Sequence, residues 1–149
     1  MLGSNGLHQD WLRTKVVKCL QVTAQPVVSV LGLTYKPGTS TLRRSLAIEL
    51  CQWLHQRGVC VQAHDPVISV LPDELQGGIK LCNRPCAALS GADLAIITTE
   101  WPDYRKLHPE DFIDAMRQPQ IIDQNWFLSG LLANDQRINY VATGRLSRS

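Results

Sequence analysis

The stretch VVSVLGLTYKPGTSTLRRSLA, residues 27–47, decides the fold predicted for this chain. Its first seven residues, 27–33, form an apolar run broken only by a serine and a glycine, which is typical of a strand buried on both faces. A loop of small and polar residues follows from Thr34 to Arg44, and Ser45 is placed to cap the next helix. At helical spacing, the inner face of that helix consists of Ala47, Leu50, Cys51 and Leu54.

The loop in this stretch carries three cations, Lys36, Arg43 and Arg44. In open α/β sheets, ligands bind where the carboxyl end of a central strand meets the amino end of a helix. Cations and exposed amides at such a place favour an anion such as a phosphate. The sequence therefore predicts an anion-binding loop between residues 34 and 45.

The rest of the chain alternates expected strands with helical segments. The expected strands cover residues 27–33, 59–63, 93–98, 120–123 and 138–142, and the other expected helices cover 9–23, 85–90 and 109–117. This alternation predicts a Rossmann-like three-layer α/β domain with a mostly parallel sheet of about five strands. Residues 67–80 are expected to form an irregular loop with one helical turn.

Composition and length limit the possible classes of protein. The chain has 149 residues, of which 44% are hydrophobic and 19% charged, so it is expected to fold as one globular domain. A net charge of +2 gives no reason to expect nucleic acid or an anionic membrane as a partner. No apolar run approaches the roughly 18 residues of a membrane helix, and residues 1–10 do not resemble a signal peptide and are expected to fray.

The five cysteines predict neither a disulfide framework nor a metal site. An odd number of cysteines without a secretion signal favours reduced thiols in a cytoplasmic protein. Cys82 and Cys86 are four residues apart, but no second pair of Cys or His residues completes a four-ligand zinc site.

The loop lacks the pattern of a complete dinucleotide site. Such a site needs three glycines at fixed places, whereas this loop offers only Gly32 and Gly38, with a Lys-Pro pair between them. Asp65 lies too far along the chain for the expected ribose-binding acid, and its ordinary interpretation is a turn residue before a proline. No P-loop motif is present either.

Several spaced motifs share one known pattern. They are Val30–Thr39 (VLGLTYKPGT), the trio Arg43, Ser45 and Ala47, the pair Asp65-Pro66, the segments Gly91–Asp93 and Thr99–Pro102, and Ile121–Asp123. In this order they resemble the C-terminal domain of the UDP-glucose/GDP-mannose dehydrogenases, enzymes that oxidise a nucleotide sugar at C6 with two NAD. The resemblance spans residues 27–145, preceded by a tail and lead-in helix (1–26) and followed by a short tail (146–149).

The resemblance implies that cofactor binding, catalysis and substrate binding are assigned to different domains. In the family, an N-terminal domain holds NAD, a central helical domain carries the catalytic cysteine and forms a dimer, and the C-terminal domain holds much of the nucleotide sugar. It therefore implies that this chain binds a UDP- or GDP-hexose, and that NAD is bound mainly by a domain absent from it. It also implies that the full enzyme is a homodimer and that no catalytic residue lies here, since no cysteine matches the nucleophile segment.

Three residues inherit a role through this resemblance. Tyr35 and Lys36 match the family's aromatic-Lys pair, which contacts the nucleotide sugar. Arg43 matches an arginine that reaches toward NAD on the other domain. The alternatives are a packing role for Tyr35, a solvated charge for Lys36 and a structural ion pair for Arg43, while Trp101 is expected to pack the loop rather than contact ligand.

Departures from the family pattern leave the substrate and the activity open. The family's acids near Ser40 and Thr41 are missing, and the Asp-Gly-Arg after a later strand is replaced by Asp123-Gln124-Asn125. Two functions remain possible: the nucleotide-sugar-binding domain of an NAD-dependent 6-dehydrogenase, or a non-catalytic nucleotide-binding module derived from that family.

Overall fold

Six parallel strands form the sheet in the part of the chain that the computed structural model describes, residues 2–21, 23–34, 45–123 and 126–142. They are β1 (Val27–Leu31), β2 (Cys60–His64), β3 (Lys80–Leu81), β4 (Leu94–Ile97), β5 (Gln120–Asp123) and β6 (Asn139–Val141). Their spatial order is β3-β2-β1-β4-β5-β6, the order of a doubly wound sheet, which confirms the Rossmann-like prediction.

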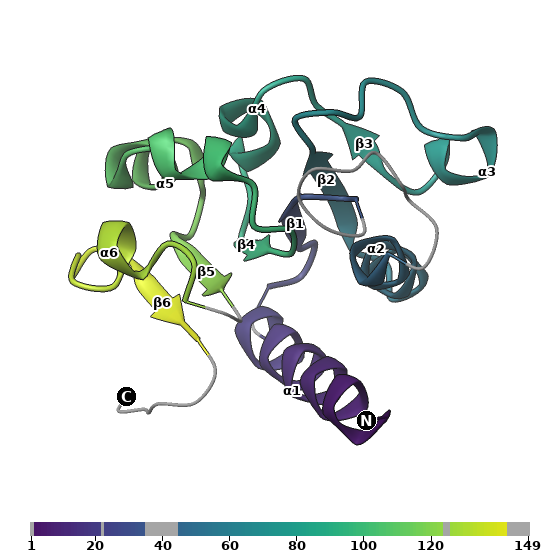
Figure 1. Ribbon diagram of the computed structural model, residues 1–149, viewed down its shortest axis with the longest axis horizontal. Coiled ribbons are helices and arrows are strands. Elements are labelled where there is room, and N and C mark those ends of the chain that lie inside the picture. The colour runs from purple at the N-terminus through teal and green to yellow at the C-terminus, as the bar shows by residue number, and fades with distance from the viewer. Residues whose placement is uncertain (1, 22, 35–44, 124–125, 143–149) are drawn as a thin grey trace.

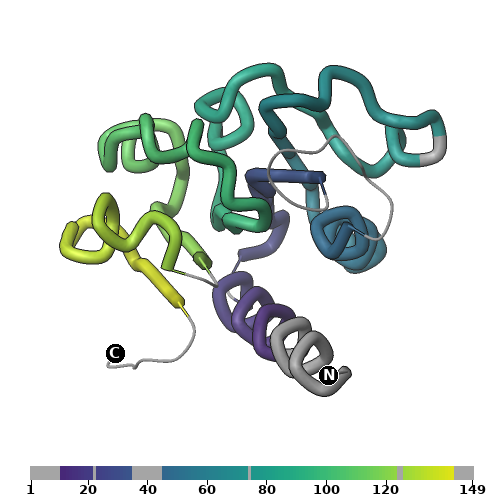
Figure 2. Tube along the Cα trace, viewed as in Figure 1, coloured from purple at the N-terminus to yellow at the C-terminus, as the bar shows by residue number. Residues whose placement is uncertain are grey.

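Helices cover both faces of this sheet (Figures 1 and 2). They are α1 (Leu2–Leu20), α2 (Leu46–Gln56), α3 (Asp73–Gln76), α4 (Pro85–Leu89), the 3-10 helix η1 (Pro102–Lys106), α5 (Pro109–Ala115) and α6 (Ser129–Leu132). Buried residues of α1 and α2 pack on one face, and those of α4, α5 and α6 pack on the other. Within the described ranges, no helix is both long enough and apolar enough to cross a bilayer.

Strand β1 is buried on both faces, as its apolar run predicts. Val28 and Val30 belong to the cluster with α1 and α2, whereas Leu31 belongs to the opposite cluster. Successive side chains of a strand point to opposite faces, so an unbroken apolar run supplies both layers of the core. The strand ends at Leu31 rather than at the expected Leu33 because Gly32 takes a φ of +103°, which turns the chain away from the sheet.

Helix α2 confirms the prediction made from the opening stretch. Ser45 is its N-cap, and the Ser45 hydroxyl accepts a hydrogen bond from the Ile48 amide at 3.3 Å. The predicted inner face is buried, and burial raises the pKa of the Cys51 thiol to about 12. That thiol is therefore a core group rather than a nucleophile.

Two local predictions were wrong. Strand β3 begins at Lys80, the last residue of the expected loop 67–80. It has only two residues, too few to show a period, and forms through pairing with Gln62 and Ala63 of β2. Residues 2–10 are helical instead of frayed. Their two glycines each cost about 1 kcal/mol relative to alanine, but no proline interrupts the propagation of α1 from its docked half, where Leu12 and Val16 are buried.

Candidate functional site

The strand order reverses at one place in the sheet, between β1 and β4. From β1 the chain continues to α2 on one face, whereas from β4 it continues through η1 to α5 on the other. The two connections therefore diverge at the carboxyl ends of these strands, and this is the place where open α/β sheets bind ligands. We call the carboxyl ends of β1, β2, β4 and β5 the carboxyl edge.

Gly32 allows the exits of β1 and β4 to touch at this edge. A Cβ atom on Gly32 would lie 2.4 Å from Cβ of Thr99, and the φ of +103° also disfavours any other residue. The Thr99 hydroxyl donates to the Thr34 carbonyl at 2.9 Å, and the Thr98 hydroxyl lies 2.9 Å from the Leu31 carbonyl. The two strand exits are therefore held together by direct contacts.

Asp65 connects three loops of the carboxyl edge. Its Oδ2 accepts hydrogen bonds from the amides of Leu33 (2.7 Å) and Thr34 (3.0 Å), and it lies 3.1 Å from the Thr34 hydroxyl. The indole Nε1 of Trp101, in the loop after β4, donates to the same oxygen at 3.2 Å. The other oxygen, Oδ1, accepts the Val67 amide at 3.0 Å, which is the turn contact expected from the sequence.

The wider role of Asp65 was missed by the sequence analysis, although its match to the family's Asp-Pro pair marked the position. Its partners at Leu33, Thr34 and Trp101 are 31 to 36 residues away in sequence. Trp101 itself is 9% exposed and packs in the core cluster beneath α4 and α5, which confirms the packing role predicted for it.

A buried pair, His64 and Tyr104, supports the end of β2. The Tyr104 hydroxyl donates to the His64 carbonyl at 3.0 Å and lies 3.1 Å from Nδ1 of the same histidine. Because the hydroxyl has one proton, we assign the Nδ1–H tautomer, in which the ring donates to the tyrosine oxygen. Burial lowers the pKa of His64 against the opposing effect of Asp65 and Asp103, and burial raises the pKa of Tyr104. Both groups are therefore held neutral near pH 7.

Asp123 anchors the chain where β5 ends. Its Oδ2 accepts the Leu128 amide and the Tyr140 hydroxyl, both at 2.6 Å. Trp126 adopts a φ of 63°, unusual for a bulky residue, and its ring packs edge-on against Tyr140 at 6.0 Å between centroids. The turn after β5 is thus fixed on both sides of residues 124–125.

The three predicted site residues, Tyr35, Lys36 and Arg43, lie outside the described residues, as do Arg44 and Asn125. The residues on either side of segment 35–44 are described. The Ser45 hydroxyl donates to the Leu33 carbonyl at 2.6 Å, and Asp65 holds Thr34. The two residues that flank this segment, Thr34 and Ser45, therefore both lie at the carboxyl edge.

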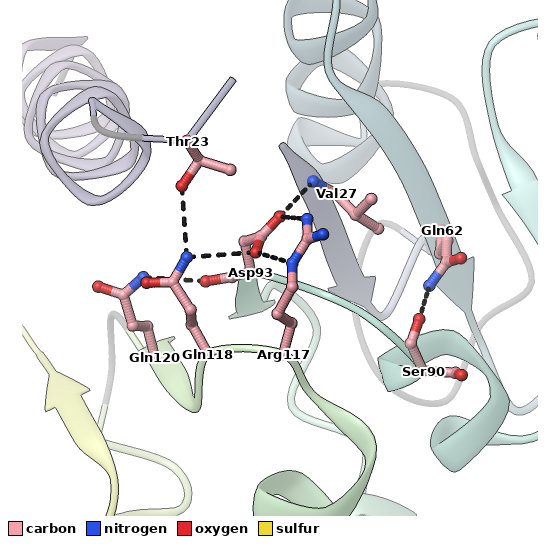
Figure 3. Close-up of polar contacts among 8 residues, drawn as sticks. All are labelled: Thr23, Val27, Gln62, Ser90, Asp93, Arg117, Gln118 and Gln120. Carbon is pink, nitrogen blue, oxygen red and sulfur yellow. Dashed lines mark hydrogen bonds and ion pairs between the residues drawn. The ribbon is translucent and has the colours of Figure 1, made fainter. Parts of the chain in front are cut away.

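The opposite, amino edge of the sheet has a carboxylate of its own (Figure 3). The side chain of Asp93 is fully buried and accepts hydrogen bonds from Nε and Nη2 of Arg117 at 2.7 and 2.6 Å. It also accepts from the backbone amide of Val27 at 2.9 Å and from the side-chain Nε2 of Gln118 at 3.2 Å. Gln118 also reaches the Thr23 hydroxyl at 3.3 Å. A shallow pocket of about 430 Å³ lies beside this network, but it is not at the edge where the predicted site residues begin and end.

Comparison with known proteins gives a consistent match. The model of the UDP-glucose/GDP-mannose dehydrogenase family, UDP binding domain, matches residues 29–129. UDP-glucose 6-dehydrogenase AglM of Haloferax volcanii is 40% identical over 96 residues, which are 64% of this chain and 22% of that protein. UDP-glucose 6-dehydrogenase of Rickettsia typhi is 30% identical over 119 residues, 78% of this chain and 27% of that protein.

Solved structures of nucleotide-sugar dehydrogenases contain a domain with the same fold as this chain. The UDP-N-acetyl-mannosamine dehydrogenase Cap5O of Staphylococcus aureus matches with a TM-score of 0.74 at 20% identity, over 91% of this chain and 30% of that one. A UDP-glucose dehydrogenase of Pyrobaculum islandicum matches with a TM-score of 0.68 at 26% identity, over 96% and 30%. This chain spans about a quarter of the length of the curated relatives it matches. Since the family match covers more than half of the chain, the chain belongs to the UDP-glucose/GDP-mannose dehydrogenase family and corresponds to its UDP binding domain.

Proposed function

We propose that this chain binds a nucleotide sugar, a UDP-hexose or GDP-hexose, at the carboxyl edge. In this proposal Tyr35 and Lys36 contact the nucleotide sugar and Arg43 reaches toward NAD held by another domain. The observation that carries it is the attachment of segment 35–44: Asp65 holds its start, Ser45 its end, and both attachments lie beside the switch point between β1 and β4.

The chemistry of the proposed residues suits this ligand. The Lys36 ammonium offsets charge on a diphosphate or donates to the sugar, and the Tyr35 ring offers a flat apolar face with a polar hydroxyl. Arg43 presents a guanidinium fork that matches the phosphate oxygens of a dinucleotide. In sequence they lie between β1 and α2, and binding residues are commonly found in segments that connect the elements of a rigid scaffold.

In a longer protein, this domain serves the oxidation of an NDP-hexose to the NDP-hexuronate. NAD and the catalytic cysteine come from other domains in this proposal, and the full enzyme is a cytoplasmic homodimer. The domain described here holds the nucleotide end of the substrate, orients the sugar and excludes water. Nucleotide-sugar binding is common to this proposal and to the non-catalytic module, so that step is tested first.

Calorimetric titration of the 149-residue chain with UDP, UDP-glucose and GDP-mannose tests the proposal. Lys36→Ala is expected to weaken binding about 10- to 100-fold, since a hydrogen bond to a charged group is worth about 1.5–3 kcal/mol. The matched control is Lys18→Ala, which removes an exposed lysine of α1. No binding of any of the three ligands, or equal affinity of both variants and the unchanged chain, would contradict the proposal.

A further inference from the structure

We propose that Asp65 is a positioning residue for the nucleotide sugar. It acts through Thr34: by fixing this residue, Asp65 sets the point and direction from which the chain continues to Tyr35 and Lys36. This inference rests on the proposed function, and it assigns to Asp65 a role beyond its own turn.

The hydrogen bonds to Asp65 fix both the position and the backbone orientation of Leu33 and Thr34. Leu33 and Thr34 are consecutive, and both of their amides point at the same carboxylate oxygen, at 2.7 and 3.0 Å. Two successive amides on one acceptor restrict the backbone orientation of both residues. Thr34 is also held from its other side, because its carbonyl accepts the Thr99 hydroxyl at 2.9 Å. Thr34, the residue before Tyr35, is therefore held through both its amide and its carbonyl.

The same oxygen also joins the two sides of the switch point. Trp101 Nε1 lies 3.2 Å from Asp65 Oδ2 and 3.2 Å from the Thr34 hydroxyl. Asp65 itself belongs to neither β1 nor β4, since it follows β2. Its carboxylate thus links the exit of β1 to the exit of β4 from outside both strands, which is the geometry of a residue that supports a site without contacting the ligand.

All donors to Asp65 among the described contacts are neutral: three backbone amides, one hydroxyl and one indole. Asparagine has the same shape but only one acceptor oxygen, and its NH₂ group would face a donor on one side. Asp65→Asn therefore keeps the packing while weakening the anchor. Asp93 provides a matched control, since it is a buried aspartate with four donors at the opposite edge.

The experiment compares Asp65→Asn with Asp93→Asn in the 149-residue chain by three measurements: thermal unfolding, calorimetric titration with UDP-glucose and amide hydrogen exchange. We expect Asp65→Asn to raise the Kd for UDP-glucose about 10-fold or more, because small misplacements of binding groups are costly. Asp93→Asn is expected to change the Kd less than about 2-fold at a temperature where both variants are folded, as its contacts lie at the other edge. Exchange at the amides of Leu33 and Thr34, which donate to Asp65, is expected to rise only in Asp65→Asn.

A second pair of variants, at Thr34, tests the positioning role even if Asp65→Asn does not fold. Thr34→Val removes one donor to Asp65 while keeping the shape, and Thr34→Ser keeps the hydroxyl. We expect weaker binding in Thr34→Val and near-normal binding in Thr34→Ser. Equal Kd values for Asp65→Asn and Asp93→Asn, or for the two Thr34 variants, overturn the positioning role.

The exchange measurement separates this inference from the proposed function. If the unchanged chain binds neither UDP-glucose nor UDP, the proposed function is wrong, and the part of the inference that concerns affinity is wrong with it. Exchange then still decides whether Asp65 fixes the start of segment 35–44. If exchange at the amides of Leu33 and Thr34 does not change in Asp65→Asn, the anchoring role is wrong, whatever the ligand.

Discussion

The two edges of the sheet each bury an aspartate, but they use it differently. At the amino edge, Asp93 forms an ion pair with the Arg117 guanidinium, which neutralises the charge of the carboxylate. At the carboxyl edge, Asp65 receives only neutral donors in the part of the chain that the structure describes, and those donors come from loops that leave β1, β2 and β4.

The two networks therefore have different roles. The amino-edge network stabilises the fold, whereas the carboxyl-edge network holds the loops that follow the strands. The amino-edge network joins strand starts to the linker after α1, through Val27 and Thr23 (Figure 3). The carboxyl-edge network fixes the departure of a segment that carries three cations, Lys36, Arg43 and Arg44. We propose a ligand at the carboxyl edge because the segment that carries these three cations in sequence follows Thr34 there, whereas Arg117 at the amino edge is paired with Asp93.

The largest expected effect comes from Gly32→Ala at the carboxyl edge. The new Cβ would lie 2.4 Å from Thr99 Cβ on a backbone with φ +103°, so we expect a loss of unfolding free energy of about 3 kcal/mol or more. Urea unfolding measures it. Gly130→Ala is the control, since a Cβ there would meet no atom within 4 Å beyond its chain neighbours and the backbone of its own helix. If both variants are equally stable, the exits of β1 and β4 are not held as tightly as their contacts indicate.

Local pattern was sufficient to predict most of the elements but not the two aspartate networks. The apolar run of β1, the Ser45 cap and the inner face of α2 follow from periods and capping within a few residues of sequence. Apart from the turn contact with Val67, the contacts of Asp65 and Asp93 join residues 24 to 66 positions apart and form only when the strands pair. Sequence pattern therefore predicted the Asp65 turn and missed the anchor.

The predicted binding residues show a different limit. Local pattern marked Lys36 and Arg43 as cations of an anion-binding loop, whereas the specific roles of Tyr35, Lys36 and Arg43 came from resemblance to a family. All three lie outside the described residues, so their roles stay predictions. Strand β3 was missed for a physical reason: two residues have no measurable period, and their pairing with β2 depends on the rest of the sheet.

A smaller loss of stability is expected from a substitution at the amino edge, and its size depends on pH. The Arg117 guanidinium holds the pKa of Asp93 below its usual range, so Asp93→Asn is expected to cost about 2 kcal/mol of unfolding free energy at pH 7. A depressed pKa contributes stability above the unfolded value of about 3.9, and that contribution is lost as the pH falls through the folded value. The difference from the unchanged chain should therefore shrink toward pH 2.5.

Denaturant unfolding at a series of pH values between 7 and 2.5 measures this dependence. Asp114→Asn, at an exposed position of α5, is the matched control and should change the stability little at any pH. A cost of Asp93→Asn that stays constant down to pH 2.5 would mean that the ion pair is not the source of the stability.

The smallest expected effect is a pH dependence of the unfolding free energy at the carboxyl edge. It falls in a higher pH range than that of Asp93, because it comes from a histidine, His64. Burial lowers the pKa of His64 in the folded chain, so between that value and the unfolded value of about 6.5 the unfolded chain binds the extra proton. Stability from this group is complete above pH 6.5 and falls as the pH drops below it. His64→Gln should remove this slope, whereas His55→Gln, at an exposed position of α2, should keep it. The slope of unfolding free energy between pH 5 and 7 decides the matter: if it survives in His64→Gln, the neutral histidine at the end of β2 is not what makes the carboxyl edge sensitive to mild acid.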